Sequence, residues 1–243
     1  MNSPETAEWP EANQRYLMAA VALVRSALEQ HTRTTKGDVK NNDRDHAAEE
    51  LLHEAAKALP APSGLETLCA AFRLSPFERD VLLLCAGIEL DSTFAACCAT
   101  AKGDARKLYP TFSLALAALP EAHWSALSPS ASLRRWRLIE LTGNEGLVSA
   151  PLRIDERVLH FLTGINCLDD RLLGLVKPIS VPNELPLSQL NVARCIAKLW
   201  TNSKNEIHPI AQLCGVDGIG RRAVAARRQA ARARTCRFPC GAG

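Results

Sequence analysis

Residues 133–154 have the sequence LRRWRLIELTGNEGLVSAPLRI, and this stretch decides the fold. The segments Leu133 to Leu141 and Gly146 to Ile154 flank Thr142-Gly-Asn-Glu145, which is typical of a β-hairpin. The apolar segments before it are predicted to be helices. The sequence therefore predicts a mainly α-helical protein with one small β-hairpin, an α+β fold.

The helices around the hairpin are indicated by periodicity and by residues that favour helix ends. Apolar residues at helical intervals predict helices over 11–30 and 45–59, joined by a polar linker at 31–44. A further helix is predicted over 187–200 and a strand over 207–214. Serine, threonine or aspartate in the capping position predicts helices that follow Ser63, Ser75, Asp91, Thr111, Asp155 and Asp169.

A glycine-rich stretch follows the last predicted strand, Gly215-Val-Asp-Gly-Ile-Gly-Arg-Arg222. It keeps the glycine spacing of a Walker A loop, G-x-x-x-x-G-K-[ST], with Arg221 at the lysine position and Arg222 at the hydroxyl position. An Ala/Arg-rich helix is predicted next, so phosphate could meet a helix N-terminus. The candidate phosphate contacts are Gly215, Asp217, Gly218, Ile219, Gly220, Arg221 and Arg222. The alternative is an ordinary turn between a strand and a helix.

The charge of the chain is unevenly distributed. The net charge is +3, yet residues 221–243 contain seven arginines and no acidic residue, so residues 1–220 are mildly acidic. An acidic body gives no reason to expect nucleic-acid binding. The predicted helices at 111–127 contain no lysine or arginine that could reach base edges. Arg134, Arg135 and Arg137, on the first predicted strand, are possible anion contacts or ordinary solvated charges.

The cysteines and the hydropathy of the sequence indicate the cellular compartment of the protein. The nine cysteines form no C-x-x-C pair and lie mostly in apolar runs, which is typical of buried reduced thiols. No metal site is predicted. The sequence has no signal peptide and no apolar segment of membrane-spanning length, so we expect a cytoplasmic protein with no membrane partner.

Several segments in order carry a resemblance to a known family: Leu74–Cys85, Leu133–Leu141, Pro151–Gly164, Leu168–Leu172 and the glycine-rich stretch. Together, over roughly residues 65–227, they resemble the N-terminal half of bacterial AAA-family ATPases with a winged-helix domain ahead of the ATPase core. The resemblance implies ATP as a ligand, oligomerisation through the ATPase core, and an N-terminal region that holds protein partners.

The same resemblance predicts what this chain lacks. The family's ATPase needs a Walker B acid pair, sensors, arginine fingers and a helical lid, whereas the 21 residues after Arg222 contain no acid. We therefore expect no enzymatic activity, no functional cofactor, and a truncated product that acts in protein interaction. The alternatives are weak phosphate binding by the loop and DNA binding by a winged helix.

The sequence suggests four parts. They are an N-terminal helical region (1–62), a winged-helix-like domain (63–180), a linker with a helix (181–206), and a truncated P-loop segment with a basic tail (207–243).

Overall fold

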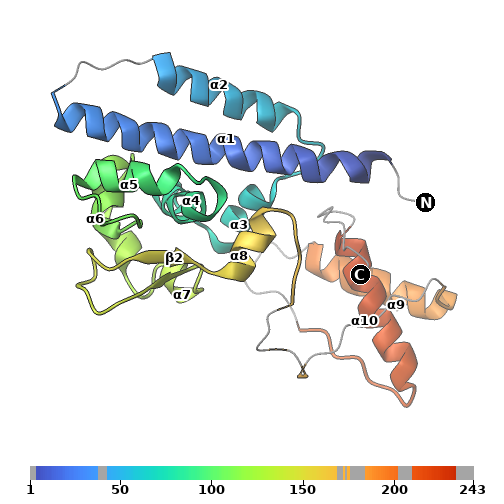
Figure 1. The fold of residues 1–243 in the computed structure, drawn as a ribbon. Helices are drawn as coiled ribbons and strands as arrows, with labels where there is room; N and C mark the ends of the chain where they lie inside the picture. Colours follow the sequence, from blue (N-terminus) through green and yellow to red (C-terminus); the bar gives the residue numbers. More distant parts are fainter. Residues whose placement is uncertain are drawn as a thin grey trace. The chain divides into compact units, whose positions relative to one another are not determined.

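A computed structural model describes residues 4–37, 43–168, 172, 174–175, 184–201 and 210–233. The chain forms two compact units, Met1–Cys167 and Leu168–Gly243. The described residues are mostly helical, with one two-stranded antiparallel hairpin, as predicted (Figure 1). The suggested division at residue 62 falls inside the first unit.

The first unit is built on α1 (Pro4–Thr35), which is longer at both ends than predicted. Residues 31–35 belong to this helix and not to a linker. Figure 1 shows α2 (Asp43–Lys57) along one side of α1 and the remaining helices of the unit along the other. Leu51 of α2 is 57% exposed, whereas Ala48 is buried.

Four helical segments form the body beneath α1. They are α3 (Gly64–Phe72), α4 (Pro76–Leu90), α5 (Phe94–Lys102) and α6 (Phe112–Ala118), followed by the 3-10 helix η1 (Trp124–Leu127). Ser63, Ser75 and Thr111 cap α3, α4 and α6 through their hydroxyls, as predicted. Asp91 instead ends α4, and its carboxylate accepts hydrogen bonds from the backbone N–H and hydroxyl of Thr93, so α5 starts later than expected.

The hairpin is shorter than predicted. Its strands are β1 (Ile139–Leu141) and β2 (Leu152–Ile154), paired with Ile139 opposite Ile154 and Glu140 opposite Arg153. The segment Ser132–Arg135 forms a four-residue helix, α7, where a strand was expected. The hydroxyl of Ser132 donates a hydrogen bond to the carbonyl of Phe72 at 2.8 Å. This contact with α3 spans 60 residues of sequence, so no local pattern could reveal it.

A helix closes the first unit. Asp155 caps α8 (Glu156–Leu162) as predicted. Gly164 follows in the left-handed region, at φ +90°, and the N–H of Ile165 donates to the carbonyl of His160. This pattern is a helix end terminated by a glycine in the left-handed conformation.

One continuous core unites these elements. Its fully buried side chains come from α1, α3–α8 and both strands, with Phe77, Phe94 and Phe112 the largest. Two contacts in this core depend on a particular residue type. Gly87 lies against the ring of Phe94, where a Cβ would be 2.6 Å from the ring. Asn13 is 1% exposed and bridges α3 and α8.

The second unit contains two described helices, α9 (Leu187–Thr201) and α10 (Gly218–Ala233). Ala193 and Ile196 of α9 pack on Val224 of α10. The predicted helix at 187–200 is confirmed. The predicted strand is not found at 210–214, where the described backbone has no regular structure. The helix expected after Asp169 lies outside the described residues.

Candidate functional site

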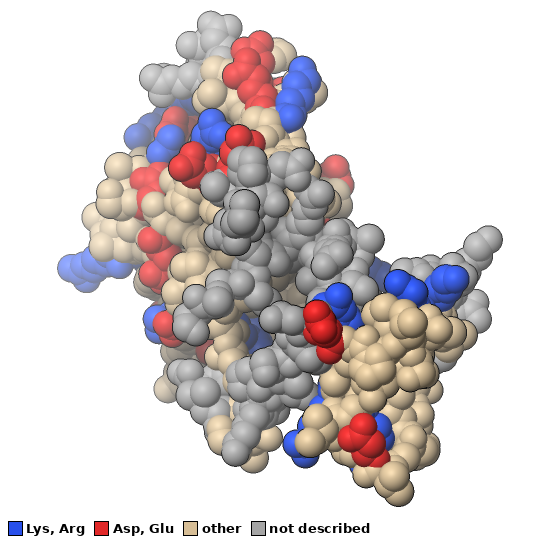
Figure 2. Space-filling view, turned by 90° about the vertical axis from the view of Figure 1, so that its right-hand side faces the viewer, with Lys and Arg blue, Asp and Glu red and all other residues tan. Residues whose placement is uncertain are grey.

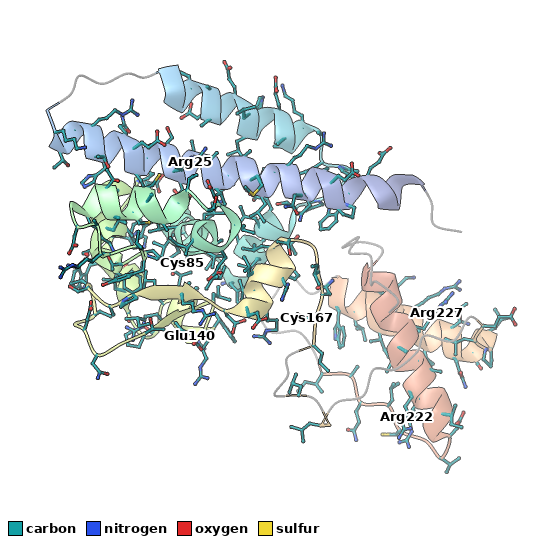
Figure 3. All side chains as sticks on the ribbon, in the orientation of Figure 1. Arg25, Cys85, Glu140, Cys167, Arg222 and Arg227 are labelled. Carbon is teal, nitrogen blue, oxygen red and sulfur yellow. The ribbon has the colours of Figure 1, made fainter. Side chains whose placement is uncertain are left out.

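The glycine-rich stretch forms the start of α10. Helix residues begin at Gly218, so Gly218, Ile219, Gly220, Arg221 and Arg222 all lie within its first turns and not in a separate loop. Gly215 and Asp217 precede the helix. Figure 3 shows Arg222 near the N-terminal end of α10 and Arg227 further along it. The side chains of Arg221 and Arg222 are exposed.

The helix N-terminus is occupied by the protein's own carboxylate. Asp217 Oδ1 accepts a hydrogen bond from the N–H of Gly220 at 2.9 Å. A Cβ on Gly220 would lie 2.2 Å from Asp217 Oδ2 and 2.6 Å from Gln189 Nε2, so glycine is needed there for close packing. The carboxylate takes a donor that a phosphate would use and repels an anion at the same place. This geometry is that of an ordinary capped helix.

The three arginines near the hairpin are not equivalent. Arg134, on α7, is half-buried, and its Nη1 donates to the carbonyl of Leu127 at 2.7 Å, so it ties α7 to η1. Arg135 ends α7 and is exposed. Arg137 is exposed in the turn between α7 and β1, with φ +52°. Only Arg135 and Arg137 offer free surface charge.

Between these two arginines in the chain lies Trp136. The Trp136 side chain is 51% exposed, and one part of it packs on Phe72 with ring centroids 5.7 Å apart. The guanidinium of Arg135 lies 5.4 Å from the Trp136 ring centroid. An anchored, solvent-facing tryptophan beside two arginines is the composition of a protein-binding hot spot. We call Arg135, Trp136 and Arg137 the tryptophan surface.

The helix directly before the hairpin is too short to read DNA. At four residues, α7 is about 6 Å long, at 1.5 Å per residue. Its Leu133 is fully buried, and Ser132 and Arg134 are bound to the protein's own carbonyls. A recognition helix needs several side chains that reach base edges along the major groove. Arg135 alone remains for such a role.

Near the hairpin, the described charges are of both signs. On the exposed face of the hairpin, Glu140 lies directly opposite Arg153, so the charge of that arginine has an opposite charge beside it. Figure 2 shows one face of the molecule, on which acidic and basic side chains alternate among the coloured residues.

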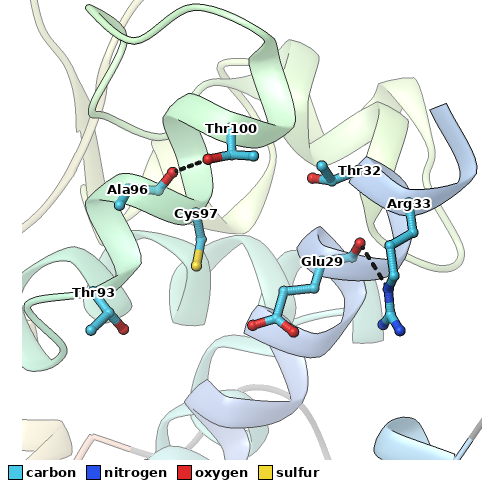
Figure 4. A pocket seen from close by; sticks show the side chains of 7 residues that line it. All are labelled: Glu29, Thr32, Arg33, Thr93, Ala96, Cys97 and Thr100. Carbon is cyan, nitrogen blue, oxygen red and sulfur yellow. Dashed lines mark hydrogen bonds between the residues drawn. The ribbon is translucent and has the colours of Figure 1, made fainter. Parts of the chain in front are cut away.

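A pocket of about 400 Å³ lies between α1 and α5 (Figure 4). Its polar groups mostly serve their own helices: Thr32 donates to the carbonyl of Leu28, Thr100 to that of Ala96, and Arg33 Nε to that of Glu29. Burial and the nearby Glu29 carboxylate raise the pKa of the Cys97 thiol. The pocket therefore presents no activated nucleophile.

Other chemistry is scarce among the described residues. Burial raises the pKa of the Cys69 thiol to about 11 and of Cys98 to about 12, and it also raises that of Cys85, which lies within the helical body (Figure 3). The expectation of buried cysteines holds for Cys85 and Cys98, but Cys167, Cys195 and Cys214 are exposed. No group of three potential metal ligands occurs in the described part of the chain. None of its helices is long and apolar enough to cross a membrane.

Comparisons with known proteins locate the fold but not a specific relative. No curated protein and no solved structure matches this sequence. A family model described as "winged helix domain, variant" matches residues 5–176, which is most of the chain. This range extends from the start of α1 beyond the hairpin and α8. The chain therefore belongs to the winged helix domain (variant) family.

Proposed function

We propose that this winged helix domain is a protein-interaction module and that its contact area is centred on Trp136. The observation that carries the proposal is the exposed indole held on Phe72 between two free arginines. Trp136 remains 51% exposed although its ring also packs on Phe72. Tryptophan and arginine are the residues most enriched among the anchors of protein interfaces.

The indole is held in place before any partner arrives. The neighbouring ring of Phe72 supports one part of it, and the Ser132 hydroxyl bond to the Phe72 carbonyl fixes the short helix beside it. An anchor that is already ordered loses little conformational entropy on binding. The two arginines add charge-assisted hydrogen bonds, and we infer that the matching partner surface combines an apolar hollow with carboxylates.

Base-specific DNA binding is the weaker alternative. It would have to use α7, which is four residues long and whose other side chains are buried or bonded to the protein. Phosphate binding at the start of α10 is also weaker, because Asp217 occupies that helix end. We propose accordingly that the chain itself is not an enzyme. The partner-holding N-terminal part of an AAA-family ATPase is the role that the sequence resemblance supports.

Site-specific photo-crosslinking tests this proposal. A benzophenone amino acid replaces Trp136 in the full chain, and Leu51, an exposed apolar residue on α2, receives it as the matched control. Irradiation in extract of the source cells is expected to give one discrete protein adduct from position 136, lost when Arg135 and Arg137 are both changed to alanine. Adducts that nuclease removes, or identical products from both positions, would contradict the proposal.

A further inference from the structure

A second pocket, of about 260 Å³, lies on the first unit away from the tryptophan surface. It is bounded by the end of α1, the end of α5, the start of α6 and the loop before β2. Its wall combines histidine, lysine and hydroxyl side chains, from His31, Lys102, Lys107, Thr111, Ser113 and Ser149. None of the described residues that line it carries a carboxylate. This composition differs from that of the larger pocket, whose wall includes Glu29 and whose polar groups serve their own helices.

Lys102 is held at the pocket and not free to leave it. Its ammonium donates a hydrogen bond to the carbonyl of Tyr109 and lies 4.2 Å from the centroid of the Tyr109 ring. An ammonium has three protons, so one hydrogen bond leaves two to donate. The side chain is thus a fixed cation with spare donors, which a flexible surface lysine is not.

Lys107 supplies a second positive charge. Its Nζ is 3.8 Å from Asp104 Oδ2, a loose ion pair longer than a hydrogen bond. Burial lowers the pKa of the Lys102 ammonium, Cys98 opposes this effect, and the Lys107 charge lowers the pKa further, against Glu145 and Asp104. An anion placed between the two lysines would relieve this repulsion, since an opposite charge favours the protonated form of both.

Hydroxyl groups complete the wall. Thr111 and Ser113 are joined at 3.0 Å between their oxygens, and Thr111 Oγ1 also accepts from the N–H of Leu114. When the Thr111 hydroxyl donates to the Ser113 oxygen, the hydroxyl proton of Ser113 can be donated to a ligand. The Ser149 hydroxyl takes part in none of the hydrogen bonds found in the described part of the chain, although its backbone N–H is bound to Gly146. Two fixed or nearby cations and two hydroxyls suit an oxyanion better than a cation or an apolar group.

We propose that this pocket binds a small oxyanion of the phosphoryl class, held by Lys102 and Lys107 and by the hydroxyls of Ser113 and Ser149. The pocket volume favours a small ligand, because pockets that bind drug-sized molecules start near 300 Å³. The pocket has room for a phosphoryl group and for part of the molecule that carries it. The phosphoryl group can belong to a free small molecule or to a phosphorylated side chain of another protein.

Titration of the full chain with sodium phosphate tests the site, with sodium chloride at equal ionic strength as the control. Phosphate is expected to shift the backbone amide resonances of Lys102, Lys107, Ser113 and Ser149 in a saturable way, and chloride is not. O-phosphoserine in a short peptide forms the second arm. Equal or tighter binding of the peptide identifies a protein-borne phosphoryl group, and weaker binding identifies a free small anion.

Variants separate this site from nonspecific charge effects. Lys107→Met removes a charge held only by a loose ion pair, so the fold is retained, and phosphate affinity is expected to fall about tenfold, which equals about 1.4 kcal/mol. Lys57→Met, on the exposed end of α2, removes the same charge elsewhere and should leave affinity unchanged. Nonsaturable shifts, equal shifts with chloride, or equal losses in both variants would overturn the proposal. None of these results bears on the tryptophan surface.

Discussion

Asn13 offers the most direct test of how α1 is joined to the rest of the first unit. Its Nδ2 donates to the carbonyl of Leu162 at 2.9 Å, and its Oδ1 accepts from the N–H of Gly64 at 2.8 Å. The side chain is 1% exposed. Asn13→Ala leaves a buried donor and a buried acceptor unpaired, and each such group costs about 1–3 kcal/mol. We expect a loss of about 2–6 kcal/mol, a large part of the stability of a typical domain.

Urea denaturation followed by circular dichroism measures this loss. Gln14→Ala is the matched control, because Gln14 is the next residue of α1 and is exposed. The amide of Gly64 should also exchange faster in Asn13→Ala, since it has lost its acceptor. A loss below about 1 kcal/mol would refute the reasoning, because even one unpaired buried group should cost that much. Equal losses in the two variants would refute it as well.

A second variant separates the two hydrogen bonds of Asn13. Asn13→Asp keeps an acceptor for the Gly64 N–H but sets an ionised carboxylate against the Leu162 carbonyl. Protonation converts the new carboxyl into a donor, and burial raises its pKa. Asn13→Asp should therefore be more stable at pH 5 than at pH 7, measured relative to the natural protein at each pH. Identical losses of stability at pH 5 and pH 7 would show that the hydrogen bond to the Leu162 carbonyl is unimportant.

Three further predictions concern single contacts in the first unit. Gly87→Ala gains about 1 kcal/mol of helix propensity but places a methyl group 2.6 Å from the Phe94 ring, and overpacking of this kind costs about 1–3 kcal/mol. The variant should therefore lower the free energy of unfolding in urea titrations. In a protein with Phe94→Leu, the same substitution should raise it. Hydrogen bonds from Thr93, together with the Arg25 guanidinium at 2.6 Å, lower the pKa of the Asp91 carboxyl. The stabilisation by ionised Asp91 is thus complete above the pKa of about 3.9 in the unfolded chain, and it is lost as the pH falls through the lower pKa of the folded protein. Arg25→Met should therefore reduce the difference in the free energy of unfolding between pH 5 and pH 2.5. Burial and a neighbouring carboxylate raise the pKa of Tyr16 to about 12, so ultraviolet titration with the chain's other tyrosine replaced by phenylalanine should show no ionisation near pH 10.

Local signals in the sequence predicted much of the helical framework. Ser75 with Glu78 forms a full capping box, and Asp155 with Gly164 bounds α8, because these effects depend only on residues a few positions apart. The extent of α1 was underestimated, since its polar ends continue as helix beyond the apolar stripe. Such ends are set by packing against other elements, which no single window contains.

The candidate site was harder to predict for the same reason. The residues Leu133–Leu141 suggested one strand, yet the first three of them belong to α7, which is held by Ser132 on the distant Phe72. The exposure of Trp136 follows from that helix and could not be inferred without it. Lys102 and Ser149 lie 47 positions apart in sequence and meet only because α5 and the loop before β2 converge on α6.

The position of Asn13 in the chain also determines when its hydrogen bonds can form during protein synthesis. Its two backbone partners lie 51 and 149 positions later in the chain. At about 5–20 residues per second, the second partner is made roughly 7–30 s after Asn13 itself. During that interval the apolar stripe of α1 has left the ribosome without the surface that will cover it. The newly made N-terminal helix is therefore a natural target for chaperones, and weakening its contacts should reduce the yield of folded protein before it changes any activity.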